Sequence, residues 1–158
     1  PDVPKEKYND LANRYRYHYL KQQEMITLFK GVLPMLDGLR ERGHFLAVAT
    51  GKSRRGLNEA LQHPDLRGLF DATRTADETA GKPHPLMLQE LMAELSVEPE
   101  RLLMIGDTTH DLQMAQNAGC ASVGVTYGAH AVDDLRSCAP LYVAHDVQDL
   151  HAWLRTNG

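Results

Sequence analysis

Two carboxylates stand four residues apart where an apolar run ends, in the stretch Met104-Ile105-Gly106-Asp107-Thr108-Thr109-His110-Asp111. If the run is a strand and the next residues open a helix, both acids point toward the carboxyl edge of a sheet, where open α/β sheets build their sites. Two acids at that edge contribute little to packing. They suit a hard cation such as Mg²⁺, which keeps several waters and takes few carboxylates. The pattern predicts a metal site at Asp107 and Asp111.

Two more polar groups follow predicted strands. Thr50, with Gly51 next to it, comes after an apolar run, and Lys82 lies in a Gly-Lys-Pro turn. Alone, such a Thr is more often a helix cap, and such a Lys is more often simply solvated. Together with the two acids, however, they bring a hydroxyl, an ammonium and two carboxylates to one sheet edge. The first two suit phosphate oxygens and the acids suit a metal, so the set indicates phosphoryl transfer by positioning and charge stabilisation.

The elements that must position these groups alternate along the chain. Apolar runs predict strands at residues 44–49, 69–73, 102–105, 121–126 and 141–143. Caps, Gly and Pro punctuation and spacing predict helices at residues 5–30, 34–42, 53–62, 85–95, 109–118, 132–137 and 147–154. Alternating strands and helices imply βαβ units and a parallel sheet, which is an α/β fold.

Composition narrows the class of protein. A chain of 158 residues is expected to form one domain, or one domain with a small appendage. The net charge of −4 argues against nucleic acid as a partner, and no apolar run is long enough for a membrane span. Two cysteines do not make a disulfide framework, and no His/Cys spacing resembles a zinc site, so a cytoplasmic protein is the expectation.

Three segments resemble motifs II, III and IV of the haloacid dehalogenase (HAD) superfamily. They are Ala-Val-Ala-Thr-Gly at 47–51, Gly-Lys-Pro-His-Pro at 81–85 and Gly-Asp-Thr-Thr-His-Asp at 106–111, in the family's order. The later segment 118–128, Ala-Gly-Cys-Ala-Ser-Val-Gly-Val-Thr-Tyr-Gly, is similar to the tail of the phosphoglycolate phosphatase-like branch. The resemblance covers residues 31–158. It implies a three-layer Rossmann-like parallel sheet, with residues 1–30 as the remnant of a helical cap.

The resemblance also implies roles for individual residues. Thr50 would hydrogen-bond the transferring phosphoryl group, with Gly51 beside it in the phosphate site, and Lys82 would neutralise phosphate charge. Asp107 would ligate Mg²⁺ directly. Asp111 would support the site, either through a metal-bound water or by orienting Lys82. Such enzymes attack with an aspartate, form a phosphoaspartyl intermediate and hydrolyse it with water.

One expected motif is absent. The family's motif I, an Asp-x-Asp that carries the nucleophile and the general acid/base, does not occur in this sequence. In the family its strand lies at the centre of the sheet, between the strands that bear Thr50 and Asp107. We therefore expect the nucleophile to lie upstream of Pro1, or on a separately supplied strand, and the chain as written to be inactive alone. Without that strand, two sheet edges would be left unpaired.

The predicted function is a Mg²⁺-dependent phosphatase for a small phosphorylated metabolite, such as glycolate phosphate, acting as a monomer or homodimer. Dehalogenases and phosphomutases share the scaffold, although the two motif IV acids weigh against a dehalogenase. A receiver domain also uses acids, Thr and Lys, but in the order acids, Thr, Lys, which this chain does not follow. A non-catalytic binding domain remains the alternative if motif I is truly absent.

Three other features have simpler interpretations. His84 and His110 flank the motifs and are expected to be solvent-exposed near a polar site, although either could touch substrate. The cationic and aromatic side chains at residues 13–18 could face a substrate from the cap, but a helix with one face toward the core is the favoured interpretation. Cys120 follows a helix stop and enters a strand, so we expect a small buried apolar residue.

Overall fold

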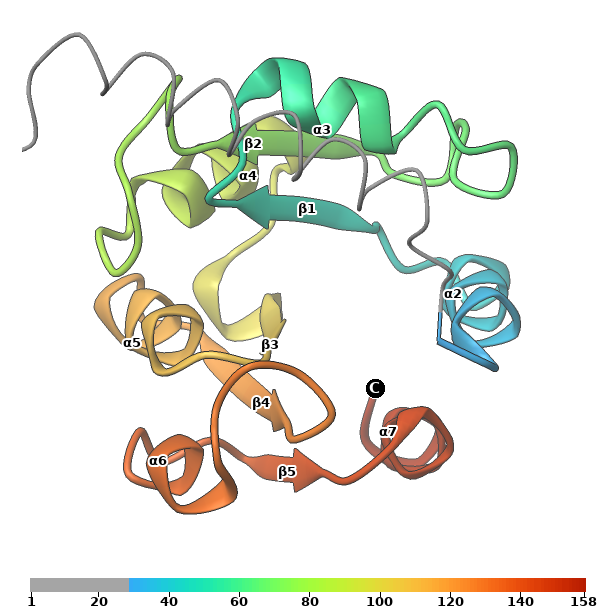
Figure 1. Ribbon diagram of the computed structural model, residues 1–158, viewed down its shortest axis with the longest axis vertical. Helices are drawn as coiled ribbons and strands as arrows, with labels where there is room; N and C mark the ends of the chain where they lie inside the picture. Colours follow the sequence, from blue (N-terminus) through green and yellow to red (C-terminus); the bar gives the residue numbers. More distant parts are fainter. Residues whose placement is uncertain (1–28) are drawn as a thin grey trace, which may run out of the picture.

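The computed structural model describes residues 29–158, which alternate between short strands and helices (Figure 1). The strands are β1 (Ala47–Thr50), β2 (Ala72–Thr75), β3 (Leu103–Gly106), β4 (Ala121–Val125) and β5 (Tyr142–Ala144). The α-helices are α2 (Val32–Glu41), α3 (Arg54–Ala60), α4 (Leu86–Leu95), α5 (Thr109–Asn117), α6 (Val132–Arg136) and α7 (Val147–Asn157). A 3₁₀ turn, η1 (Pro99–Arg101), precedes β3. The predicted α/β class is confirmed.

All the paired strands are parallel, and they form two groups. β1 pairs with β2, and β3, β4 and β5 pair in that order. Within the described part of the chain, β1 and β3 are not paired with each other, and Figure 1 shows the two groups apart. Because the strands run parallel and each returns through a helix, the loops that follow them lie at the carboxyl ends of the sheets.

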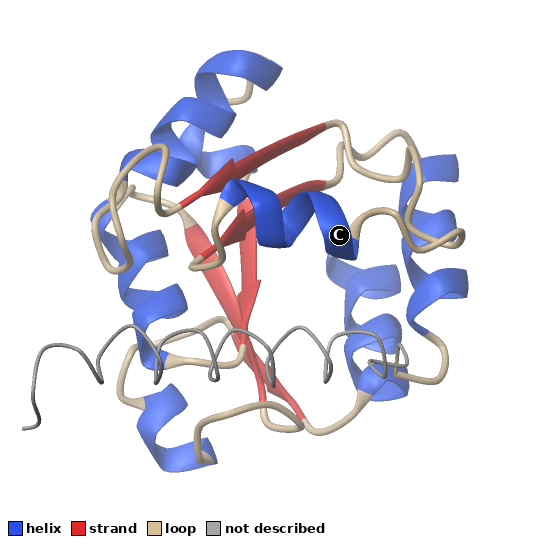
Figure 2. Ribbon diagram, turned by 45° about the horizontal axis from the view of Figure 1, so that its top comes forward, coloured by secondary structure: helices blue, strands red, loops and turns tan. Residues whose placement is uncertain are grey.

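Helices cover both faces of the strands, which gives three layers (Figure 2). On one side, α2 and α7 pack against β4 and β5 in a core that includes Met35, Val123 and Leu150. On the other side, α4 packs against β2 and α5 packs against β3 and β4, around Met87 and Met114, both fully buried. Burying these apolar faces is the main force that holds the layers together.

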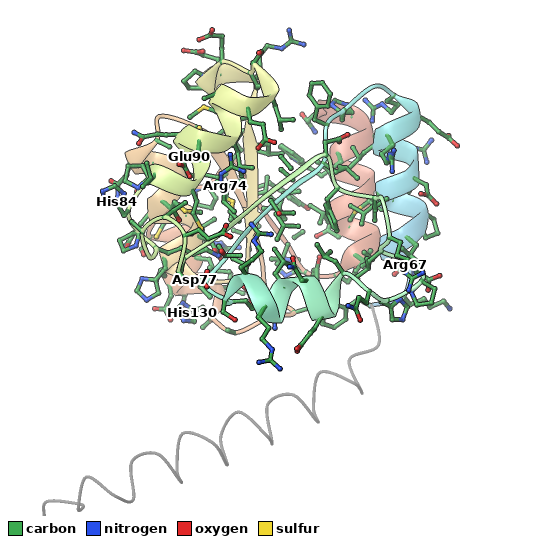
Figure 3. The ribbon with its side chains drawn as sticks, turned by 90° about the horizontal axis from the view of Figure 1, so that it is seen from above. Arg67, Arg74, Asp77, His84, Glu90 and His130 are labelled. Atoms are coloured by element: carbon green, nitrogen blue, oxygen red, sulfur yellow. The ribbon has the colours of Figure 1, made fainter. Side chains whose placement is uncertain are left out.

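Local signals set several element ends as the sequence predicts. Ser53 caps α3 by accepting a hydrogen bond from the Gly56 N–H at 3.1 Å. Asp146 caps α7 in the same way, and Gly119 turns the chain with φ of 73° after α5. An ion pair between Arg74 of β2 and Glu90 of α4, 3.2 Å apart, adds a polar link across one layer (Figure 3).

The predicted element boundaries differ from the structure in a few places. β1 begins at Ala47 rather than at 44, and β2 begins at Ala72 rather than at 69. Leu69 is buried, so its apolar character reflects packing rather than strand pairing. The turn η1 was not predicted. The predicted helix at 5–30 and the predicted cap remnant at 1–30 fall, but for their last two residues, outside the described part of the chain.

A cavity of about 300 Å³ lies between the two groups of strands. Ala47 and Ala49 of β1 line it, and so do Leu103 and Met104 of β3, while α4 contributes apolar side chains. Of these strand residues, Ala47 is exposed and the other three are only partly buried, in contrast to Val123 of β4, which has no exposed surface. The space therefore lies where a continuous sheet would have strand-to-strand contact.

Candidate active site

Four loops meet at the carboxyl ends of β1 to β4. They are residues 51–53, 76–85, 107–108 and 126–131. Figure 3 places Asp77 and His84, from the loop at residues 76–85, and His130, from the loop at residues 126–131, toward one side of the molecule, while Arg67, which precedes β2, lies on the opposite side. The predicted site residues therefore belong to the edge of the sheets at which parallel α/β folds bind ligands.

Asp107 follows β3 and is held by the loop that follows β4. The Ala129 N–H donates to Asp107 Oδ2 at 3.0 Å, and the His130 N–H donates to the Asp107 main-chain carbonyl at 3.1 Å. Gly128 lies so close to the Asp107 carboxylate that a Cβ there would overlap it. Within residues 29–158, no group donates a hydrogen bond to Asp107 Oδ1, so this oxygen is available to a ligand.

Thr108 and Asp111 form a capping box at the start of α5. The Thr108 hydroxyl accepts from the Asp111 N–H at 3.2 Å, while Asp111 Oδ2 accepts from the Thr108 N–H at 3.2 Å and from its hydroxyl at 2.9 Å. The box satisfies helix donors that would otherwise lack partners. It also fixes the Asp111 carboxylate directly beneath the end of β3, where a Cβ on Gly106 would overlap it.

The other oxygen of Asp111 pairs with Lys82. The Lys82 ammonium donates to Asp111 Oδ1, and the two side chains are 19% and 5% exposed. The peptide bond between Lys82 and Pro83 is cis. Both oxygens of Asp111 are therefore engaged by protein donors, and one of them holds the ammonium of the predicted phosphate-binding lysine in place.

Thr50 ends β1, whereas Asp107 follows β3, which belongs to the other group of strands. Its hydroxyl oxygen accepts from the Lys52 N–H at 3.1 Å, and its carbonyl accepts from the Ala76 N–H at 3.0 Å. The hydroxyl proton remains available for donation to a ligand oxygen. The structure thus brings Lys82 and Asp111 into contact, whereas no direct contact joins Thr50 to either of them within the described residues.

A charged network that the sequence analysis missed ties the Thr50 loop to the loop after β2. The Arg54 guanidinium pairs with Glu78 at 2.8 Å and donates to the Thr73 hydroxyl at 2.7 Å. The main-chain N–H of Arg54 donates to the Asp77 carboxylate at 3.1 Å. The Thr75 hydroxyl, fully buried, donates to Asp77 at 2.6 Å. The Asp-Glu pair after a strand end was the available signal.

These contacts shift the pKa values of the network in the directions that favour its charges. The hydrogen bond with Glu78 raises the pKa of Arg54 above its ordinary value. The Thr75 hydroxyl, and then the Arg54 N–H, lower the pKa of Asp77, and the hydrogen bond from Arg54 lowers the pKa of Glu78. The network stays charged at neutral pH and fixes the geometry of the loop that carries Thr50 and Gly51.

The remaining predictions for single residues agree with the structure. His84 and His110 are exposed, as expected. His84 Nδ1 accepts from the Leu86 N–H, and the His110 ring lies 6.3 Å from the ring of His130. Cys120 is buried, and burial raises the pKa of its thiol.

The described residues offer few side chains that could bind a metal ion together. No group of three or more His, Cys, Asp or Glu side chains that could hold a metal occurs within residues 29–158. The Asp107 carboxylate, with one open oxygen, nevertheless fits a Mg²⁺ ion that is held by one or two carboxylates and several waters. Zinc, which is typically held by three or four His, Cys, Asp or Glu side chains, has no such site in this part of the chain.

The described residues form a parallel, Rossmann-like α/β core with an acid, a lysine and a threonine at the carboxyl ends of its strands. Residues 2–125 match the family described as haloacid dehalogenase-like hydrolase, and the chain belongs to that family. The expectation drawn from the three motifs is thereby confirmed.

Two proteins that are similar in sequence to this chain carry phosphatase names. It is 38% identical over 133 residues to IndB of Dickeya dadantii, which carries the name of a phosphatase, covering 81% of this chain and 58% of that protein. It is 31% identical over 142 residues to a phosphoglycolate phosphatase of Mannheimia succiniciproducens, covering 89% and 63%. The chain thus spans about three fifths of the length of these relatives.

A solved structure shows the same fold. The chain matches a protein of Haemophilus somnus 129PT, described as a predicted phosphoglycolate phosphatase, with a TM-score of 0.88 and 24% identity. The match covers 97% of this chain and 69% of that one. Within residues 29–158, no helix combines the length and the apolar character that crossing a membrane requires.

Proposed function

We propose that this chain supplies the Thr50, Lys82 and Asp107 part of the active site of a Mg²⁺-dependent phosphatase. The observation that carries the proposal is the Lys82–Asp111 ion pair, which is nearly buried beside the end of β3 and aims an ammonium at the edge where Asp107 lies. A charged pair there is costly to bury and contributes little net stability, so a functional role accounts for it better than packing does.

Phosphate recognition would use three groups. The Thr50 hydroxyl keeps its proton for a phosphate oxygen, because its own oxygen already accepts from the chain. Gly51 is exposed at the turn after β1, and its N–H would add a main-chain donor. Lys82 would neutralise the charge on the phosphate and on the nucleophile. Together they would hold the phosphoryl group in position while charge shifts in the transition state.

Asp107 would hold the metal through its open oxygen, while Ala129 fixes the other oxygen. Mg²⁺ bound there would offset negative charge on the phosphate oxygens. For Asp111, the structure favours the orienting role over direct ligation, because both of its oxygens already accept hydrogen bonds. Its contribution to the metal would then be through a water.

The nucleophile would come from an extended segment seated between β1 and β3. The cavity between these strands, about 300 Å³ in volume, supports this placement because each bordering strand runs parallel to its own neighbour and, within residues 29–158, has one unpaired edge. A strand there would end between Thr50 and Asp107. An aspartate at its end could attack phosphorus, form a phosphoaspartyl intermediate and release phosphate after attack by water.

The substrate we propose is a small phosphorylated metabolite of the phosphoglycolate type, as in the relative named for that reaction. A phosphomutase or dehalogenase activity, or a binding role without catalysis, is the alternative outcome of the same scaffold. Cytoplasmic location and a monomeric or homodimeric state also remain predictions.

The test is phosphate release from a panel of substrates by the protein expressed with its upstream coding sequence. The panel includes phosphoglycolate, pyrophosphate and glucose 1-phosphate, and a 2-haloacid is assayed separately for halide release. We expect Mg²⁺-dependent release from phosphoglycolate or a similar monoester, and a loss of about 100-fold or more in kcat for Asp107→Asn. Asp37→Asn, an exposed acid on α2, is the control and should retain full activity.

Two outcomes would contradict the proposal. An Asp107→Asn enzyme with unchanged turnover and unchanged Mg²⁺ dependence would show that the metal assignment is wrong. An upstream sequence without an Asp-x-Asp at the end of an apolar strand would leave only a binding role, which would be measured as phosphoglycolate affinity without turnover.

A further inference from the structure

The loop at residues 126–131 turns back over the end of β3 and surrounds Asp107. It begins where the Thr126 N–H donates to the Ala144 carbonyl at 3.0 Å, which anchors it to β5. Gly128 then packs directly on the Asp107 side chain, and the next two main-chain N–H groups bind that residue. The loop at residues 126–131, which follows β4, therefore fixes the orientation of the Asp107 side chain, which follows β3.

His130 closes this loop with its side chain. The Thr109 N–H donates to His130 Nδ1 at 3.1 Å, across 21 positions of sequence. Thr109 is the first residue of α5, and its N–H is one of the helix donors that lack a partner within the helix. Because Nδ1 accepts a hydrogen bond, the proton of a neutral ring resides on Nε2.

The two hydrogen bonds of His130 hold both ends of the segment at residues 107–109. Its main-chain N–H binds the carbonyl of Asp107, and its ring binds the N–H of Thr109, two residues later. Together they lock the turn from β3 into α5 against the loop from β4. With the ring removed, the loop that carries the Ala129 donor to Asp107 Oδ2 would lose its side-chain link to the start of α5, while Thr126 and Tyr127 would still hold its beginning.

We propose that His130 is a positioning residue for Asp107: by anchoring the loop at residues 126–131 to the start of α5, it fixes the carboxylate in the orientation that binds Mg²⁺. The inference rests on the proposed metal role of Asp107, but its geometric part is independent of that role. Residues that orient metal ligands from outside the coordination sphere typically change metal affinity by about 10- to 100-fold when they are lost.

The experiment compares His130→Leu with His130→Asn in the protein. The Asn side-chain oxygen can occupy the place of Nδ1 and accept from the Thr109 N–H, whereas Leu fills the space without an acceptor. Mg²⁺ affinity is measured by calorimetric titration of the metal alone. We expect about a tenfold or greater loss for His130→Leu and recovery to within about threefold of wild type for His130→Asn.

Amide hydrogen exchange provides a readout that does not require metal. In His130→Leu, exchange at the Thr109 and Ala129 amides should accelerate about tenfold or more, while His130→Asn should keep both protected. His145→Asn is the control, because this exposed histidine between β5 and α7 makes no side-chain hydrogen bond within residues 29–158 and should change neither readout.

The outcomes separate this inference from the proposed function. Wild-type Mg²⁺ affinity in His130→Leu would overturn the inference, and so would equal losses in the Leu and Asn variants. If wild-type protein binds no Mg²⁺, the metal role of Asp107 fails. Exchange then decides the anchoring role alone: unchanged protection in His130→Leu overturns it, and accelerated exchange rescued by Asn supports it.

Discussion

Replacing Lys82 by Met should destabilise this protein far more than removing an ordinary surface charge. In the native structure, Asp111 is 5% exposed and its Oδ1 accepts from the Lys82 ammonium, which is 19% exposed. Lys82→Met keeps much of the side-chain volume but leaves that oxygen charged, buried and without its donor. The expected result is a large loss in the free energy of unfolding.

The magnitude follows from burial. Removing one partner of a buried ion pair costs about 3–5 kcal/mol, because the remaining charge is not compensated. The partial exposure of the Lys82 side chain lets some water reach the site, and Thr108 still donates two hydrogen bonds to Oδ2. We therefore expect the lower end, about 3 kcal/mol, which corresponds to a shift of roughly 1.5 M in the urea midpoint at a slope of about 2 kcal/mol/M.

Urea unfolding at neutral pH, with chelator present to exclude metal, measures the effect. Arg55→Met is the matched control: Arg55 pairs with Glu59 at 3.1 Å, but its side chain is 86% exposed. An exposed pair four residues apart on a helix is worth only about 0.3–0.5 kcal/mol, so the midpoint should shift by about 0.25 M at most. The contrast isolates burial from charge removal.

A second variant tests the reason for the loss. Lys82→Met combined with Asp111→Asn should be more stable than Lys82→Met alone, because a neutral amide costs less to bury than an unpaired carboxylate. The reasoning would be refuted if Lys82→Met shifted the midpoint no more than Arg55→Met. It would also be refuted if the double variant were less stable than the single one.

Three further predictions concern packing and pH. Gly106→Ala should cost about 1–3 kcal/mol in urea unfolding, because its Cβ would overlap the Asp111 side chain. Leu112→Ala, at a site with no exposed surface, should cost about 2–5 kcal/mol in the same assay. The His145 N–H, and then a tyrosine hydroxyl, lower the pKa of Asp149, so its contribution to stability is present above the ordinary Asp pKa of about 3.9 and is lost as pH falls through the lower native pKa. Thermal melts of Asp149→Asn should therefore show a smaller loss of stability on acidification.

A control and two contrary results test the Gly106 and Asp149 predictions. Gly38→Ala lies within α2 with no atom within 4 Å of the new Cβ, so it should stabilise the protein by about 0.4–1 kcal/mol, in contrast to Gly106→Ala. An unchanged urea midpoint for Gly106→Ala would show that the strand end can move away from Asp111. A wild-type acid profile for Asp149→Asn would show that other carboxylates govern acid unfolding.

Local features of the sequence predicted most of the elements and indicated candidate site residues, whose roles stay predictions. The alternation of apolar runs with capped segments predicted every strand and every α-helix of residues 29–158. These signals work because the spacing of apolar residues, N-cap residues such as Ser53 and glycines in turns all act over a few residues. The predicted starts of β1 and β2 were three residues too early, since an apolar residue such as Leu69 can be buried without strand pairing.

Only the tertiary structure decided which of the polar groups meet. Lys82 and Asp111 are 29 positions apart, and Thr109 and His130 are 21 apart, so strand order and loop path determine both contacts. The sequence by itself left two roles open for Asp111, and only the fold shows that its carboxylate pairs with the Lys82 ammonium. The Arg54 network was missed for the same reason: its partners lie across two loops, and no local spacing rule connects them.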